Sequence, residues 1–234
     1  MIRLLLLSNS TGFGGSYLDH AMPALREFLG PARTLAFVPF ALRDQQAYTA
    51  KVRERFAREG VEVSAVTADA AGRSLIESTD AAFVGGGNTF RLLDQLQRSG
   101  VLAVLRARAL AGMPYLGASA GTNIAAPTIR TTNDMPIVEP ASFEALSLLP
   151  FQINPHYLDA DPASRHMGET REDRLREYLE ENERPVLGLR EGSWLHREGS
   201  SLRLEGVAPA RLFRRGAEPR EVQPHESLDE LVTA

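Results

Sequence analysis

The pentapeptide Gly117-Ala118-Ser119-Ala120-Gly121 has the spacing of a nucleophile elbow, a sharp turn that exposes a serine between a strand and a helix. An apolar run, 113–116, precedes it, and the segment that follows can begin a helix. Only small residues fit beside the serine in so sharp a turn. The N-terminus of the following helix would present backbone N–H groups to an oxyanion. We therefore expect Ser119 to act as a nucleophile.

A second glycine-rich segment, Gly85-Gly86-Gly87-Asn88, comes directly after the apolar run 80–84. Glycines allow close approach of a ligand to the backbone and leave N–H donors accessible. The loop could complete an oxyanion hole together with the N–H of Ala120, or it could bind a phosphate. It has neither the Lys-Ser/Thr of a P-loop nor the G-x-G-x-x-G spacing. Asn88 or Thr89 is expected to cap the next helix.

A serine nucleophile needs a base, and His156 is the best placed histidine. It ends the run 150–155, which is typical of a strand followed by a loop, where a base could meet a nucleophile at a neighbouring strand end. His166 lies in a loop ten residues later and is the weaker candidate. The remaining histidines lie in a helical stretch, a hairpin pattern and a polar tail, at positions 20, 196 and 225.

The base in turn needs an acid that orients it, and two carboxylates qualify. Asp134 lies in a polar loop between Ser119 and His156, which gives the chain order of the α/β-hydrolases. Glu191 follows the apolar run 185–189 and so lies at a strand end. Chain order does not decide between them, because the same geometry occurs in several orders.

These residues need a scaffold, and the apolar runs predict one. Buried strands are expected at 4–7, 33–39, 61–66 and 80–84, and helices at 17–29, 44–59, 90–111 (broken at Gly100) and 172–180. Alternating strands and helices predict an α/β fold with a mostly parallel sheet covered on both faces, whose ligands bind at the carboxyl ends of the strands. Residues 194–204 predict a C-terminal β-hairpin, and 210–214 a further strand.

Composition narrows the function classes. The 234 residues predict a single soluble domain, 1–234, and contain no apolar run long enough to span a bilayer. The absence of cysteine excludes disulfides, thiolate metal sites and a cysteine nucleophile, and it favours a cytoplasmic location. A net charge of −4 argues against nucleic acid as a general partner. Nearly all cations are arginines, and Lys51 is the only lysine.

Taken together, these motifs resemble the peptidase E family, the α-aspartyl dipeptidases among the serine peptidases. The resemblance extends over nearly the whole chain, and its motifs are 85–88, 117–121, 131–140, 151–157, 168–171 and 190–194. It implies a flavodoxin-like fold related to class I glutamine amidotransferases, with serine in place of their cysteine. It also implies hydrolysis of dipeptides with an N-terminal aspartate, without metal. We expect no cofactor and either a monomer or a homodimer.

The resemblance also assigns roles by position. It implies that Ser119 is the nucleophile, His156 the base and Glu191 the third member of the triad. Asp134 would be a further essential acid that contacts the substrate's α-amino group, and Arg171 would bind the aspartyl carboxylate. For the oxyanion hole we expect Gly87 and Ala120, and for a substrate contact Asn88.

Two alternative functions stay open. The chain could be a β-aspartyl or cyanophycinase-like serine hydrolase, which a dipeptide panel would distinguish. It could also be a non-catalytic module that holds a nucleotide or phosphate, in which case ligand binding would survive loss of Ser119.

Overall fold

The main sheet of the protein is built around the apolar strands that the sequence predicts, and most residues of these strands are buried. The computed structural model describes residues 1–163, 165 and 167–233. Five strands run parallel in this sheet: β1 (Arg3–Leu7), β2 (Thr34–Val38), β3 (Glu62–Ala65), β4 (Ala81–Val84) and β5 (Tyr115–Ala118). Two antiparallel strands, β8 (Ser193–Glu198) and β9 (Ser201–Gly206), extend it beside β1. The strand order is β3-β2-β4-β5-β1-β8-β9.

This order explains the flavodoxin-like character of the fold. Counted from β2, the strands β2 to β5 have the spatial order 2-1-3-4, which begins the flavodoxin-like order 2-1-3-4-5. The first strand of the chain, β1, takes the fifth place. The predicted mostly parallel α/β fold is therefore confirmed, and so is the C-terminal hairpin, which is β8 and β9.

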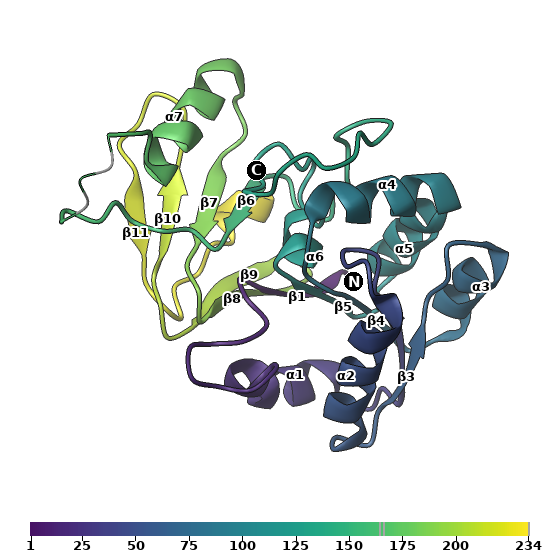
Figure 1. The fold of residues 1–234 in the computed structure, drawn as a ribbon. Helices are drawn as coiled ribbons and strands as arrows, with labels where there is room; N and C mark the ends of the chain where they lie inside the picture. The colour runs from purple at the N-terminus through teal and green to yellow at the C-terminus, as the bar shows by residue number, and fades with distance from the viewer. Residues whose placement is uncertain (164, 166, 234) are drawn as a thin grey trace.

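Helices cover both faces of the main sheet (Figure 1). On one face lie η1 (Asp19–Ala21), α1 (Met22–Leu29) and α2 (Gln45–Ala57); on the other lie α3 (Ala70–Ser78), α4 (Thr89–Ser99), α5 (Val101–Leu110) and the short α6 (Ala120–Asn123). Alternate residues of β1 separate the two cores. Leu5 and Leu7 pack with α1 and α2, whereas Leu4 and Leu6 pack with α3 to α5.

The break between α4 and α5 lies at Gly100, as the sequence predicts, because this residue has a left-handed conformation with φ of 70°. Two local expectations differ from the structure. The helical stretch predicted from position 17 begins only at Asp19, after Leu18 with its positive φ. Helix α3 was not predicted, since only Leu75 and Ile76 are large apolar residues in it.

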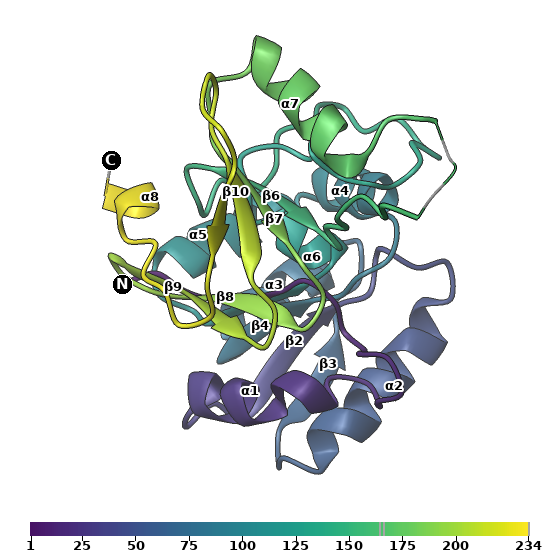
Figure 2. The same cartoon turned by 90° about the vertical axis from the view of Figure 1, so that its left-hand side faces the viewer.

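A second sheet forms the C-terminal third. It consists of β6 (Gln152–Pro155), β7 (Val186–Leu189), β10 (Ala210–Phe213) and β11 (Arg220–Val222) in the order β11-β10-β7-β6. Helix α7 (Arg171–Glu181) packs on one of its faces, as Figure 2 shows. The other face joins the core of α4 and α5. The sequence predicts three of these strands but not their separation from the main sheet. The last element among the described residues is the short helix α8 (Glu230–Thr233).

Candidate active site

Ser119 occupies the turn between β5 and α6. Its backbone has φ of 53° and ψ of −110°, a conformation that side chains rarely adopt. The flanking glycines make this turn possible. A Cβ at Gly117 would lie 2.6 Å from the carbonyl oxygen of Gly121, and a Cβ at Gly121 only 2.0 Å from that of Val84. The predicted elbow is thus present, although α6 is a single short turn rather than a long helix.

His156 directly follows β6 of the second sheet and faces the serine. Its Nε2 lies 2.9 Å from Ser119 Oγ. The residue has a positive φ of 54°, and its backbone N–H donates to Ser8 Oγ at 2.9 Å. Ser8, at the end of β1, in turn donates its hydroxyl to the carbonyl oxygen of Leu189 at 2.7 Å. The buried Ser8, which follows β1 of the main sheet, therefore holds the backbone of His156 in place next to β7 of the second sheet.

Glu191 completes a relay with these two residues. Its Oε1 lies 2.6 Å from His156 Nδ1. Because a carboxylate can only accept, this contact favours the tautomer with the proton on Nδ1, which leaves Nε2 free to accept from the serine. The loop that carries Glu191 connects β7 to β8, and the N–H of Gly192 donates to Asn9 Oδ1 at 2.9 Å. The relay is open to solvent, since the side chains of His156 and Glu191 are 37% and 51% exposed.

Of the two carboxylates that the sequence left open, the structure brings Glu191 to the histidine. Asp134 lies elsewhere, at the start of α4. Its Oδ2 accepts from the N–H of Thr89 at 2.7 Å and from the hydroxyl of the same residue at 2.6 Å. Asn88 also contacts the loop that carries Asp134, because its Nδ2 donates to the Met135 carbonyl. Its Oδ1 accepts from the N–H of Arg91 and so caps α4.

The glycine loop lies against the serine. A Cβ at Gly86 would be 2.9 Å from Ser119 Cβ, and the N–H of this glycine donates to the hydroxyl of Tyr48 at 2.8 Å. Burial raises the pKa of Tyr48, which keeps its phenol neutral. Within the described part of the chain, no hydrogen bond uses the N–H groups of Gly87 and Ala120. Two unused donors beside a serine can stabilise an oxyanion.

Arg171 is the first residue of α7, and its guanidinium bonds to the side-chain oxygen of Asn133. Asn133 also donates to the Pro155 carbonyl at 2.7 Å, directly before His156. Burial, followed by the nearby positive charge of Arg174, lowers the pKa of Arg171 from its ordinary value. A half-buried guanidinium with only an amide for a partner favours an anionic ligand.

The carboxylates around Arg171 bind other groups. Glu169 pairs with Arg174, Glu172 with Arg176 and Arg211, and Asp173 accepts from Thr170 in a capping box. Over the described residues, then, Arg171 has no carboxylate partner, and the surface ion pair expected of an arginine among acids is not formed. His166, the weaker candidate for the base, lies outside the described residues.

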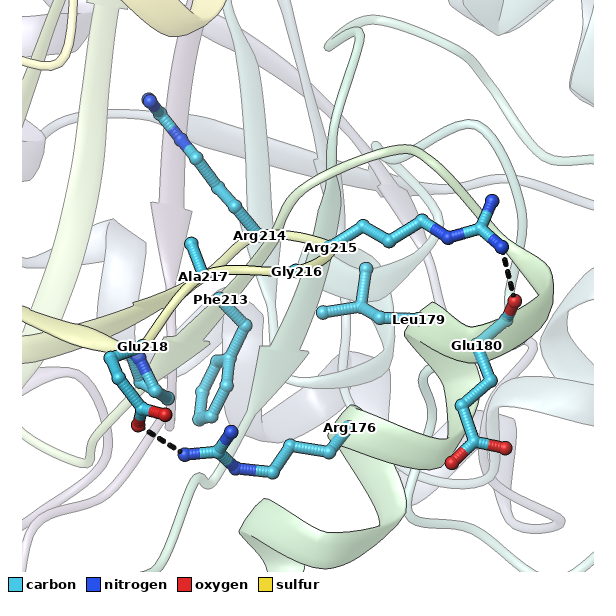
Figure 3. Close-up of a pocket in the computed structure, with 10 residues that line it drawn as sticks. Arg176, Leu179, Glu180, Phe213, Arg214, Arg215, Gly216, Ala217 and Glu218 are labelled. Carbon is cyan, nitrogen blue, oxygen red and sulfur yellow. Dashed lines mark hydrogen bonds and ion pairs between the residues drawn. The ribbon is translucent and has the colours of Figure 1, made fainter.

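Two cavities contain residues of the predicted site, and a third lies apart from it. The one beside Ser119 and His156 has a volume of about 560 Å³ and a wall formed by α2. Arg171 lines a separate hollow of about 280 Å³ together with Arg174 and residues 158–161 and 168–170. A third cavity, of about 470 Å³, lies between α7 and the turn 214–218 (Figure 3). Its lining includes no residue of the relay. Arg176 pairs there with Glu218 at 2.8 Å, and the other arginines of the lining pair with carboxylates next to it.

Three residues of this arrangement escaped prediction from sequence: Ser8, Tyr48 and Asn133. Ser8 could have been suspected from its position, because it ends a strand at the same edge of the sheet as the elbow. Tyr48 lies in no motif, and Asn133 lies in the motif 131–140 without a role assigned to it. In the ranges 1–163 and 167–233, and at residue 165, there is no cluster of acidic or histidine side chains that could hold a metal. No helix among these residues has the length and apolar character needed to cross a membrane.

A serine on a strand–helix elbow of an α/β scaffold, in contact with a histidine that in turn contacts a carboxylate, defines a serine-type hydrolase. The sequence profile of peptidase family S51 matches residues 4–205. The chain therefore belongs to this family of peptidases.

Its relatives match this chain over nearly their whole lengths. A Streptomyces coelicolor protein named "Peptidase E" is 57% identical over 231 residues, which cover 99% of this chain and 95% of the relative. A Drosophila melanogaster protein named "Probable alpha-aspartyl dipeptidase" is 45% identical over 233 residues, 98% of this chain and 97% of the relative. The crystal structure of a peptidase from an acI-B1 Actinobacterium is 16% identical and shares the fold, with a TM-score of 0.74 and 97% of each chain covered.

Proposed function

We propose that the protein is a serine dipeptidase that hydrolyses Asp-X dipeptides through an aspartyl-enzyme intermediate. The observation that carries this proposal is the relay from Glu191 through His156 to Ser119, with contacts of 2.6 and 2.9 Å. The names of the relatives, peptidase E and α-aspartyl dipeptidase, support the substrate class.

The geometry supports the following mechanism. His156 Nε2 takes the proton of Ser119 as Oγ attacks the aspartyl carbonyl, and Glu191 stabilises the imidazolium that forms. The N–H groups of Gly87 and Ala120 stabilise the tetrahedral oxyanion. His156 then protonates the amino group of the leaving residue. Water, activated by the same histidine, finally attacks the ester and releases aspartate.

Recognition of the N-terminal aspartate needs groups for its side chain and its amine. We assign Arg171 to the side-chain carboxylate, because a planar guanidinium binds a carboxylate with two hydrogen bonds and stays charged. Asn133 holds this guanidinium next to the residue that precedes His156. We assign Asp134 to the α-amino group: its Oδ2 is occupied by Thr89, and Oδ1 would accept from the ammonium. For Asn88 the structure supports a capping role, and a substrate contact stays a prediction.

The decisive experiment is hydrolysis of four dipeptides by the purified protein: Asp-Leu, Asn-Leu, Glu-Leu and β-Asp-Leu. We expect Asp-Leu to be cleaved far faster than the others, and Ser119→Ala to abolish the reaction. Preferred cleavage of β-Asp-Leu would instead identify a β-aspartyl hydrolase. Equal turnover by the Ser119→Ala variant would overturn the serine mechanism. A cytoplasmic location is part of the proposal and is supported by the absence of cysteine.

A further inference from the structure

The cavity beside the catalytic serine contains two cations that the mechanism above does not use. Its lining includes Ser119, His156 and the glycine loop on one side, and Arg43 and Lys51 on the other. Lys51 is the only lysine of the chain. Both cations come from α2 and the segment before it, on the other side of the molecule from Arg171 and α7. In both ribbon views α6, which follows Ser119, lies between α2 and α7 (Figures 1 and 2).

Lys51 is connected to the serine by a continuous series of contacts. Its Nζ lies 4.4 Å from the centre of the Tyr17 ring, a cation–π contact. The hydroxyl of Tyr17 donates to that of Tyr48 at 3.4 Å, and Tyr48 accepts from the N–H of Gly86, which lies against Ser119. The ammonium is therefore held over an aromatic wall of the same cavity.

The charge of these cations is not neutralised within the described part of the protein. Neither Arg43 nor Lys51 forms an ion pair there, and the one carboxylate of the lining, Asp44, accepts from the N–H of Ala47 as the N-cap of α2. In contrast, the cations of the cavity in Figure 3 pair with neighbouring carboxylates. Unpaired cations in the wall of an active-site cavity favour an anionic part of the ligand.

An Asp-X dipeptide has two carboxylates, and the proposed function uses only one of them. We propose that Lys51, with Arg43, binds the C-terminal carboxylate of the leaving residue X, and that Leu42 and Ala47 in the same lining contact its side chain. The inference rests on the proposed function. It gives the enzyme a physical reason to prefer dipeptides, since in a longer peptide an uncharged amide takes the place of this carboxylate.

The test compares Asp-Leu with Asp-Leu-amide, which lacks only the terminal charge. Wild-type enzyme should prefer the free acid. Lys51→Met keeps the aliphatic stem on Tyr17 and removes the charge, so kcat/KM for Asp-Leu should fall about tenfold, the range for one hydrogen bond to a charged group. The value for Asp-Leu-amide should stay unchanged. Lys51→Arg should restore most of the loss. Arg58→Met, which removes an exposed cation of similar length next to α2, is the matched control and should change neither substrate.

The outcomes separate the two proposals. If the wild type hydrolyses neither Asp-Leu nor its amide, the proposed function itself fails. If it hydrolyses both equally well, or if Lys51→Met lowers both rates by the same factor, only the carboxylate site is overturned. A Lys51→Met variant that loses the preference for Asp-Leu over Asn-Leu would also overturn it, because Lys51 would then bind the aspartyl side chain.

Discussion

Two residues of the relay, Ser119 and His156, have backbones with positive φ. Such conformations cost about 1–3 kcal/mol each in residues other than glycine, and surrounding contacts must hold them. For Ser119 the hold comes from the N–H of the serine itself, which donates to the Leu7 carbonyl, and for His156 from Ser8. The site thus has its reactive geometry before any substrate binds.

From this strain we expect opposite effects on activity and stability at Ser119. Ser119→Gly should abolish hydrolysis and raise the free energy of unfolding by about 1 kcal/mol, because glycine adopts the turn without strain. Ser119→Ala keeps the Cβ and the strain, so its stability should equal that of the wild type. Urea unfolding of the three proteins measures the difference. Equal stability of the glycine and alanine variants would mean that the turn is not strained.

The two carboxylates that sequence alone could not rank should behave differently. Glu191→Gln should lower kcat about 10²–10⁴-fold for every substrate, because the histidine loses its orienting charge. Asp134→Asn should instead reduce the advantage of Asp-Leu over N-acetyl-Asp-Leu, since the amide can still accept from Thr89 but no longer attracts an ammonium. Steady-state kinetics on both substrates decides; exchanged profiles would reverse the two roles.

Arg171 should determine the preference for aspartate. Arg171→Met should cost about 2–4 kcal/mol of transition-state binding for Asp-Leu, the range for removing one partner of a desolvated charge pair, and much less for Asn-Leu. Arg176→Met is the matched control, because Arg176 lies on the same helix but outside the hollow that Arg171 lines, and it pairs with Glu172 and Glu218. Rates of hydrolysis for the two substrates give both values. If the Arg171 variant kept the full Asp-over-Asn ratio, the aspartyl carboxylate would have to bind elsewhere.

At the scale of elements, the close approach of β4, β5 and α6 fixes the elbow. Gly121→Ala would place a methyl group 2.0 Å from the Val84 carbonyl oxygen, so α6 must move away from β4. We expect a loss of roughly 1–3 kcal/mol in stability, as for an overpacked core, and a large loss of activity. Gly12→Ala, which meets no atom within 4 Å, should be neutral. Thermal unfolding and hydrolysis of Asp-Leu test both variants, and a fully active Gly121→Ala enzyme would refute the steric argument.

The same elements show what the sequence could and could not predict. Continuous apolar runs and the positions of glycines were sufficient to predict the strands of the main sheet, the break at Gly100 and the β8–β9 hairpin. The second sheet was not predictable, because the pairing of β7 with β10 depends on which distant segments share a core, and the pattern of a strand does not contain that information. Likewise the elbow and His156 have recognisable surroundings, whereas Asn133 and Tyr48 matter only through contacts that the fold creates.

At the scale of the whole molecule, residues of both sheets contribute to one hydrophobic core, including Leu6 of β1 and Leu187 of β7. This sharing supports the proposal that residues 1–234 form a single domain. An aromatic contact also connects distant parts of the chain. His20, in η1, lies edge-on to the Trp194 ring of β8, with ring centres 6.4 Å apart, and both its ring nitrogens are buried without a partner among the described residues.

This histidine should make stability depend on pH. Burial lowers the pKa of His20, although weaker contacts with Asn9, Asp19 and Glu191 oppose the shift. Above the ordinary value of about 6.5 the ring is neutral in both the folded and the unfolded chain. As the pH falls below that value, the unfolded chain takes up a proton that the folded chain resists, so the free energy of unfolding decreases until the lowered pKa is reached. His20→Leu should show a smaller decrease. Urea titrations from pH 7 to 5 measure this; parallel curves for the two proteins would contradict the assignment.

The relay is distributed over the two sheets, since Ser119 follows β5, His156 follows β6, and Glu191 lies on the connection from β7 to β8. Displacements far smaller than those that would expose the core would break its contacts of 2.9 and 2.6 Å. The rate of hydrolysis should therefore respond to a displacement of one sheet relative to the other that is too small to disturb the core. A substitution outside the relay, such as one at Ser8, which accepts from the N–H of His156, would abolish hydrolysis through a shift that spectroscopic probes of folding do not detect.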